Sequence, residues 1–154
     1  MTGWRLGWSV WPKHLYDMAR KLAVNSFSCT NAATQFAGIA ALTGPQDAVR
    51  DMVAEFDKRR KIVVEGLNGL PNVSCATPKG AFYAFPNISK TGWKAKKLAS
   101  ALLEEAGVAT IGGGDVGVHG EGYIRLSYAN SADNIRKALA RMGESVERQT
   151  YELR

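Results

Sequence analysis

The sequence predicts an α/β chain, in which helices are followed by an α+β unit with a short, mostly antiparallel sheet and helices packed on it. Three observations predict this order. Apolar residues recur at helical spacing through the first part of the chain. One apolar stripe then continues without a break and predicts a single long helix over 45–69. After Pro71, short apolar runs between glycine and proline turns predict strands.

We expect three parts in the chain. Residues 1–44 are expected to be the C-terminal remnant of a larger domain, because three of the four tryptophans lie in the first eleven residues and little chain precedes to cover them. Residues 45–70 are expected to be an inter-domain helix, since about 25 helical residues span roughly 37 Å, more than one small domain needs. Residues 71–154 are expected to be a complete small domain.

The expected elements follow from periodicity and from breaking residues. Alternation from Trp4 to Val10 predicts a first strand, ended by Pro12, which cannot donate to a sheet ladder. Ser131 is expected to cap the last helix. The other expected elements are helices over 13–24, 32–42 and 94–105, strands over 73–76, 81–85, 108–111 and 123–128, and a glycine-rich loop over 112–122.

Composition narrows the class of protein. Hydrophobic residues make up 45% and the formal net charge is +6, values of a soluble globular chain. No apolar run approaches the ~18 residues of a membrane span, and no signal peptide is recognised, so we expect a cytoplasmic protein without a membrane partner. The two cysteines form no metal-ligand motif. The basic run Lys58–Lys61 lies among acidic residues, which favours a solvated helix face over nucleic-acid binding.

Arg125 is the most informative single residue. It lies in the middle of the expected strand over 123–128, on the face opposite Ile124, Leu126 and Tyr128. A guanidinium there is costly unless it is paired, and its planar fork suits a carboxylate. An internal salt bridge or an exposed edge are the alternatives. Arg5, at the start of the first expected strand, is a second candidate anion-binding residue, with an exposed strand end as the alternative.

Three further features are weaker. Phe82 and Tyr83 follow a glycine turn and are interpreted as mostly core; a position of one of them facing a ligand pocket is the alternative. Gly112–Gly117 does not match a phosphate-binding motif and is interpreted as a flexible loop. His119 lies in that loop, and a position near Arg125 is its less favoured interpretation.

Six segments in order resemble the class I/II, aspartate aminotransferase-type family of pyridoxal-phosphate enzymes, known as fold-type I. They are Met1–Gly7, Ala41–Pro45, Arg59–Leu67, Lys79–Tyr83, Leu103–Val108 and Gly122–Ala129. The resemblance implies that residues 1–44 end the large cofactor-binding domain and that 71–154 form the C-terminal small domain. It also implies transfer of an amino group between an aspartate-like or similar L-amino acid and a 2-oxo acid, in a cytoplasmic homodimer.

The resemblance assigns roles to two residues. Arg5 would contact the phosphate of pyridoxal phosphate, and Arg125 would hold the carboxylate of the substrate. The family's Schiff-base lysine lies eight residues before the arginine of Gly-Trp-Arg and would fall before Met1, so no catalytic residue is assigned and this chain alone is expected to be inactive. In the glycine loop the sequence departs from the family pattern at Gly112, Gly113 and Val116. A carbon–sulfur lyase, an aminocyclopropane-carboxylate synthase or a non-catalytic stand-alone domain are the alternatives.

Overall fold

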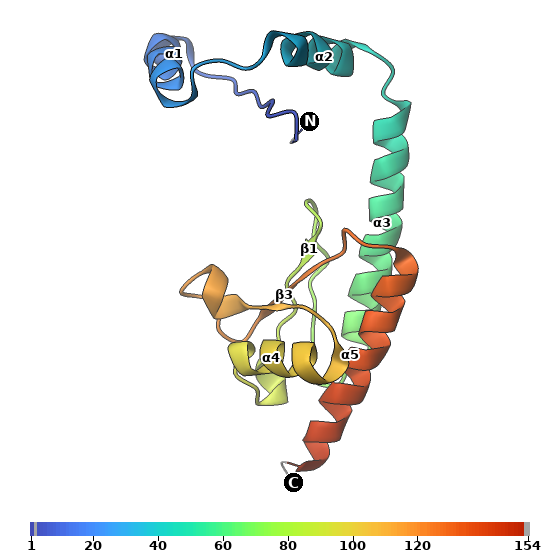
Figure 1. The fold of residues 1–154 in the computed structure, drawn as a ribbon. Helices are drawn as coiled ribbons and strands as arrows, with labels where there is room; N and C mark the ends of the chain where they lie inside the picture. The colour runs from blue at the N-terminus through green and yellow to red at the C-terminus, as the bar shows by residue number, and fades with distance from the viewer. Residues whose placement is uncertain (2, 153–154) are drawn as a thin grey trace. The chain divides into compact units, whose positions relative to one another are not determined.

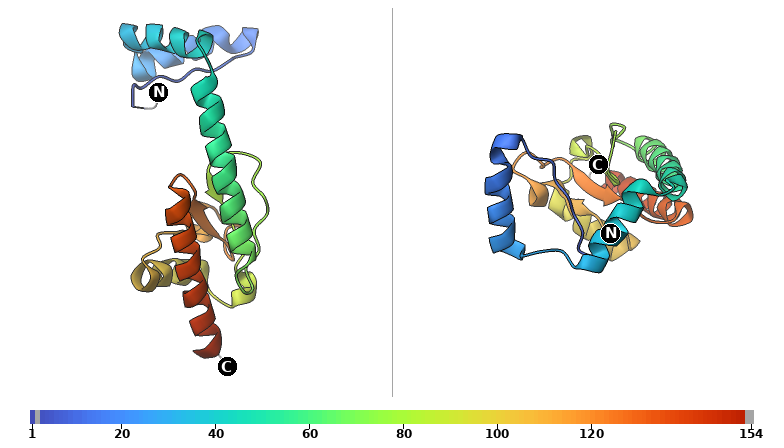
Figure 2. Two further views of the ribbon diagram at one scale, coloured as in Figure 1. Left: turned by 90° about the vertical axis from the view of Figure 1, so that its right-hand side faces the viewer. Right: turned by 90° about the horizontal axis from the view of Figure 1, so that it is seen from above.

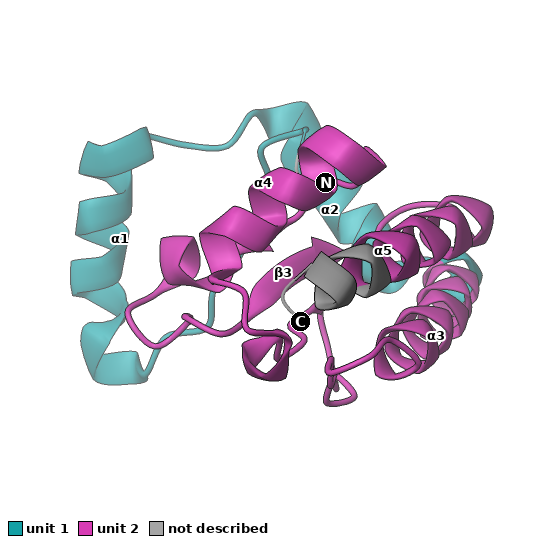
Figure 3. Cartoon of the chain, turned by 90° about the horizontal axis from the view of Figure 1, so that it is seen from below, with its two compact units in different colours: residues 1–48 teal, residues 49–154 magenta. Residues whose placement is uncertain are grey.

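The computed structural model describes residue 1 and residues 3–152, with side chains up to residue 146. The chain divides into two compact units, residues 1–48 and residues 49–154 (Figure 3). Each unit is described by itself below. No helix in the described part of the chain is long and apolar enough to cross a membrane.

Unit 1 contains the two helices that the sequence predicts. They are α1, Lys13–Phe27, and α2, Ala32–Thr43. The side chain of Asn31 caps α2 by accepting a hydrogen bond from the backbone N–H of Ala33 at 2.9 Å. The strand predicted from Trp4 to Val10 is wrong: residues 3–5 form a turn and no regular structure follows before α1.

Three helices dominate unit 2 (Figures 1 and 2). The long helix α3 covers Asp47–Asn68, α4 covers Ala95–Ala106 and α5 covers Ala132–Glu152, so all three predicted helices are confirmed. Both figures show α5 beside the C-terminal part of α3, where Gly66 lies against the side chain of Leu139. The hydroxyl of Ser131 accepts a hydrogen bond from the backbone N–H of Asn134 at 3.2 Å, which confirms the predicted cap.

The sheet of unit 2 has three short antiparallel strands in the order β1-β3-β2. They are β1, Tyr83–Ala84, β2, Ile111–Gly112, and the central β3, Ile124–Ser127. The strand predicted over 73–76 is reduced to a single bridge between Ser74 and Asn87. Two 3-10 turns, η1 over Ser89–Thr91 and η2 over Gly113–Val116, follow β1 and β2.

One face of this sheet packs into the core and the other does not. Side chains on the core face come from β1 and β3 and meet α3, α4 and α5. The core cluster is Val63, Leu67, Cys75, Ala84, Ile88, Ala95, Leu98, Leu102, Val108, Ile124, Leu126, Tyr128, Ile135 and Met142. Residues between these along the strands, such as Tyr83 and Ser127, stay exposed. We call that second surface the open face of the sheet.

The glycine-rich loop is packed more closely than the interpretation as a flexible loop implies. Gly112, Gly113 and Gly120 are buried. A Cβ on Gly113 would collide with the backbone of Gly120, so the close approach of these two chain segments requires glycine. The carboxylate of Glu121 accepts a hydrogen bond from the backbone N–H of Ala95 at 3.0 Å and so ties the loop to the first turn of α4.

Candidate functional site

Arg125 lies on the open face, in the central strand of the sheet. On one side, Ile111 of β2 lies directly opposite Arg125. On the other side, Tyr83 of β1 lies opposite Ser127, so Tyr83 is a diagonal neighbour of Arg125. The residue is half-buried. Its place between two strands removes the alternative of an exposed sheet edge.

The guanidinium of Arg125 rests on an aromatic ring. Its Cζ lies 4.8 Å from the centroid of the Tyr83 ring, within the range of a cation–π contact. Among the residues that the structure describes, no carboxylate is paired with Arg125. The salt bridge considered as an alternative is therefore not formed there, and the N–H groups of the fork remain able to bind an anion.

The two candidate pocket residues differ from expectation. Phe82 is 41% exposed and Tyr83 is 39% exposed, so their interpretation as mostly core is wrong. Their rings contact each other with centroids 4.6 Å apart, and Phe82 also lies 6.3 Å from the ring of Phe56 on α3. Aromatic contacts thus run from α3 to Arg125.

A hollow of about 330 Å³ lies beside this row of rings. Phe82 lines it, together with Phe56, Tyr128 and apolar residues of α3, whereas Tyr83 does not. Two hydrogen bonds fix its rim: the Tyr128 hydroxyl donates to the carbonyl of Ala81 at 3.0 Å, and Arg60 Nη1 donates to the carbonyl of Pro78 at 3.0 Å. Burial raises the pKa of Tyr128, which keeps this hydroxyl a donor.

Three side chains of the basic run of α3 form salt bridges with acidic residues of the same helix. Arg59 Nε lies 2.8 Å from a carboxylate oxygen of Glu55, and Asp57 is paired with Arg60 at 2.6 Å and with Lys61 at 2.7 Å. Hydrogen bonds from Lys61 and Arg60 lower the pKa of Asp57. Lys58 and Lys61 are exposed, as the interpretation of a solvated helix face predicts, whereas Arg59 and Arg60 are half-buried.

Arg5 belongs to unit 1 and is exposed. It lies in a turn closed by Met1, whose carbonyl accepts from the N–H of Trp4 at 3.1 Å and of Leu6 at 3.4 Å. Its φ of 58° is in the left-handed region, which is uncommon for a residue with a Cβ. Arg5 and Arg125 lie in different units, so the expectation that both face one ligand stays a prediction.

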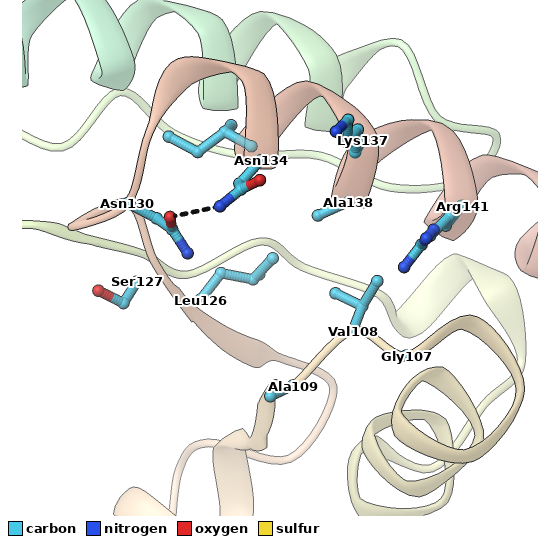
Figure 4. A pocket seen from close by; sticks show the side chains of 11 residues that line it. Gly107, Val108, Ala109, Leu126, Ser127, Asn130, Asn134, Lys137, Ala138 and Arg141 are labelled. Carbon is cyan, nitrogen blue, oxygen red and sulfur yellow. Dashed lines mark hydrogen bonds between the residues drawn. The ribbon is translucent and has the colours of Figure 1, made fainter.

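A second hollow in unit 2 has a volume of about 520 Å³ (Figure 4). Polar side chains of α5 and of the turn before it line it, and the amide of Asn134 donates to Asn130 at 3.0 Å. Arg141 Nη1 donates to the carbonyl of Ala106 at 3.5 Å, at the end of α4. Arg141 and the two amides thus already form hydrogen bonds at helix ends, which makes this hollow a weaker candidate site than the open face.

Among the described residues, no group of three metal-ligating side chains occurs.

Sequence reasoning missed the neighbours of Arg125. Phe85 and Tyr123 stack with centroids 5.0 Å apart, and Ile111 lies directly opposite Arg125. Alternation places Tyr123 on the same face as Arg125, but pairing between distant strands has no local signal, so the partners could not be named beforehand.

A comparison with known protein families shows to which family the chain belongs. Residues 1–142 match the family described as aminotransferase class I and II. The chain belongs to this family. The family match covers unit 1 together with most of unit 2, so Arg5 and Arg125 both lie in the matched region.

Individual aminotransferases are similar over nearly the whole chain. An aspartate aminotransferase of Pyrococcus horikoshii is 42% identical over 96% of the chain and 38% of its own length. The crystal structure of an aromatic aminotransferase from the same organism has a TM-score of 0.91 at 37% identity, over 97% of the chain and 40% of that structure. The crystal structure of an aspartate aminotransferase from Rhizobium meliloti has a TM-score of 0.87 at 32% identity, over 96% of the chain and 39% of that structure.

The chain therefore spans about two fifths of the length of these aminotransferases. Its three-stranded antiparallel sheet and covering helices agree with the fold expected from the sequence. Full-length members of the aminotransferase family use pyridoxal phosphate as their cofactor. Their substrates are amino acids and 2-oxo acids. An arginine with free N–H donors on the open face of the sheet is compatible with such substrates, since both carry a carboxylate.

Proposed function

We propose that these residues are the C-terminal part of a pyridoxal-phosphate-dependent aminotransferase, and that Arg125 binds the carboxylate of its substrates. The enzyme moves an amino group between an L-amino acid and a 2-oxo acid. One observation carries the proposal: the half-buried guanidinium of Arg125 lies over the Tyr83 ring without a carboxylate partner in the described part of the chain.

A carboxylate is the feature that both substrates share next to the reacting carbon. The guanidinium fork binds it through two parallel N–H···O bonds, which fixes orientation as well as position. Partial burial of Arg125 strengthens this contact, because charges attract more strongly at lower dielectric. Arg125 thereby orients the amino or keto carbon toward the rest of the active site.

Arg5 is proposed to bind the phosphate of pyridoxal phosphate. The cofactor, when bound, supplies an electron sink for the carbon that exchanges the amino group. A guanidinium suits a phosphate dianion, and the left-handed turn at Arg5 is a backbone state of the kind that persists at ligand sites. We propose that the lysine that binds the cofactor lies outside these 154 residues, so that the chain alone is inactive.

The proposed inactivity has a direct test. The 154-residue chain is mixed with pyridoxal phosphate, reduced with borohydride and digested, and the peptides are examined by mass spectrometry. We expect scattered, substoichiometric modification of surface lysines and no transamination. Stoichiometric labelling of one lysine, together with turnover, would contradict the proposal that the catalytic lysine lies elsewhere.

The role of Arg125 is tested in the complete enzyme that contains these residues. Arg125→Gln should lower kcat/KM for amino acid and oxo acid by roughly a hundredfold or more, because a charged fork and two hydrogen bonds are lost. Arg136→Gln is the matched control: Arg136 is exposed and, among the described side chains, pairs with Asp133 alone, at 3.3 Å, so its replacement should have little effect. Equal kinetics for both variants would remove the proposed role of Arg125.

The products separate the alternatives. An aminotransferase returns a 2-oxo acid and an amino acid in equal amounts, whereas a lyase releases ammonia. Aspartate and aromatic amino acids are the first substrates to assay, since relatives are named for both.

We further propose a cytoplasmic homodimer. The two free cysteines suit a reducing compartment, and sedimentation of the complete enzyme tests the dimer.

A further inference from the structure

Three arginines of unit 2 differ in whether they contact an aromatic ring, a carboxylate or both. Arg59 lies 5.4 Å from the centroid of Phe56, but its Nε also donates to Glu55 at 2.8 Å. Arg60 donates to Asp57 and to the carbonyl of Pro78. Arg125 has the ring of Tyr83 at 4.8 Å and no such acceptor among the described side chains. Its guanidinium thus lies over a ring, and its N–H groups are left for another partner.

This difference has a physical consequence. An unrestrained arginine side chain loses rotamer freedom when a ligand fixes it, and this loss weakens binding. A ring under the guanidinium plane reduces that loss before the ligand arrives and occupies no N–H donor. A carboxylate in the place of the ring would also fix the side chain, but it would compete with the substrate for the same donors.

The ring of Tyr83 is itself well placed. β1 pairs with β3 so that Tyr83 faces Ser127, one diagonal step from Arg125. Phe82 packs on the ring at 4.6 Å. The ring is 39% exposed, so its removal leaves the core of unit 2 intact.

We propose that Tyr83 is a positioning residue that holds Arg125 ready for the substrate carboxylate through its ring and not through its hydroxyl. The inference rests on the proposed function of Arg125 and adds a second residue to the carboxylate site. It concerns binding, so it predicts a change in KM with kcat preserved.

The test uses the complete enzyme with pyridoxal phosphate and steady-state kinetics for both substrates. Tyr83→Leu should raise KM by roughly threefold to tenfold, the range of a partly exposed cation–π contact, while kcat stays within about twofold. Tyr83→Phe, which keeps the ring, should restore KM to near the original value. Arg136→Gln is again the control, because Arg136 is exposed on α5 and lies 3.3 Å from Asp133, so its replacement should leave KM unchanged.

A double-mutant cycle shows whether Tyr83 acts through Arg125. In the Arg125→Gln background, Tyr83→Leu should lower kcat/KM no further, since the guanidinium that the ring positions is absent. Thermal melts of all variants check that each one folds. An undiminished effect of Tyr83→Leu in that background would overturn the proposal, as would an unchanged KM for Tyr83→Leu in the original enzyme.

The outcomes distinguish the two proposals. An Arg125→Gln variant with unaltered kinetics overturns the carboxylate role of Arg125, and the positioning role of Tyr83 with it. A strong defect in Arg125→Gln beside an unaltered Tyr83→Leu overturns the positioning role alone. A KM that rises equally in Tyr83→Phe and Tyr83→Leu assigns the effect to the hydroxyl and also overturns the role of the ring.

Discussion

Tyr128 joins the core of unit 2 to the rim of the candidate site. It is 1% exposed, and its hydroxyl donates to the carbonyl of Ala81 at 3.0 Å. Ala81 has a φ of 57°, so this bond restrains an uncommon backbone state directly before Phe82. Tyr128→Phe should lower the free energy of unfolding by about 0.5–1.5 kcal/mol, because the carbonyl loses its partner. Urea denaturation at pH 7 measures this change, and no loss of stability would contradict it.

The same residue predicts a pH dependence. Burial raises the pKa of Tyr128, so the folded state keeps the phenolic proton at pH values where the unfolded state has lost it. Stability from this group is complete below the ordinary tyrosine pKa of about 10 and falls as the pH rises toward the higher folded pKa. The stability gap between the original chain and Tyr128→Phe should therefore shrink over the pH range above the ordinary tyrosine pKa of about 10. A constant gap over that range would contradict this assignment.

Single residues show where sequence reasoning ends. Alternation predicted that Ile124, Leu126 and Tyr128 share a face without Arg125, and all three are buried as expected. The same rule could not show which face of the preceding strand the helices cover. The interpretation of Tyr83 as core is wrong for this reason, and its ring lies on the open face beside Arg125.

At the scale of elements, Ser131 gives a sharp test of a helix start. Its hydroxyl accepts from the backbone N–H of Asn134 at the first turn of α5. Ser131→Ala should cost about 1 kcal/mol, since one terminal N–H loses its acceptor. Ser100→Ala is the matched control, because Ser100 is exposed within α4 and alanine is the better helix former there. Thermal melts of both variants compare the two, and an equal effect would argue against the cap.

The helices were more predictable than the strands for a physical reason. A helix satisfies its backbone groups locally, so caps and periodicity within one segment define α3, α4 and α5. A strand needs a partner. Trp4 to Val10 alternates in the required way but has no strand beside it among the described residues, and it forms a turn and an irregular segment. The packing of Gly113 on Gly120 likewise depends on chain segments that only the fold brings together.

At the scale of the whole molecule, the two units differ in how much apolar surface they bury. Unit 2 holds the cluster of buried side chains that joins its helices and sheet. In unit 1, only Thr34 and Gly38 are buried among the described residues, and both belong to α2. Hydrophobic burial is the main stabilising term in folding, so unit 2 should carry most of the stability of this chain.

Limited proteolysis tests this difference. Cleavage requires local opening, and segments with few buried contacts open at low free energy. We expect trypsin to cut the 154-residue chain first within residues 1–48, for example at Arg20 or Lys21 of α1, where all large apolar side chains are exposed. A resistant product beginning near α3 should accumulate and melt cooperatively. First cuts inside α4 or at the strands of unit 2 would contradict the expected order.

The exposed apolar residues of unit 1 also predict association. Trp8 is 75% exposed, Phe27 is 70% exposed and Phe36 is 73% exposed. Apolar surface of this kind marks contact sites for other protein. The 154-residue chain should therefore self-associate at micromolar concentration, and a shortened chain of residues 45–154 should do so less. Sedimentation velocity over a range of concentrations measures both. Equal association of the two chains would place the contact surface on unit 2, where the apolar side of α3 around Val49, Met52 and Val53 is also exposed.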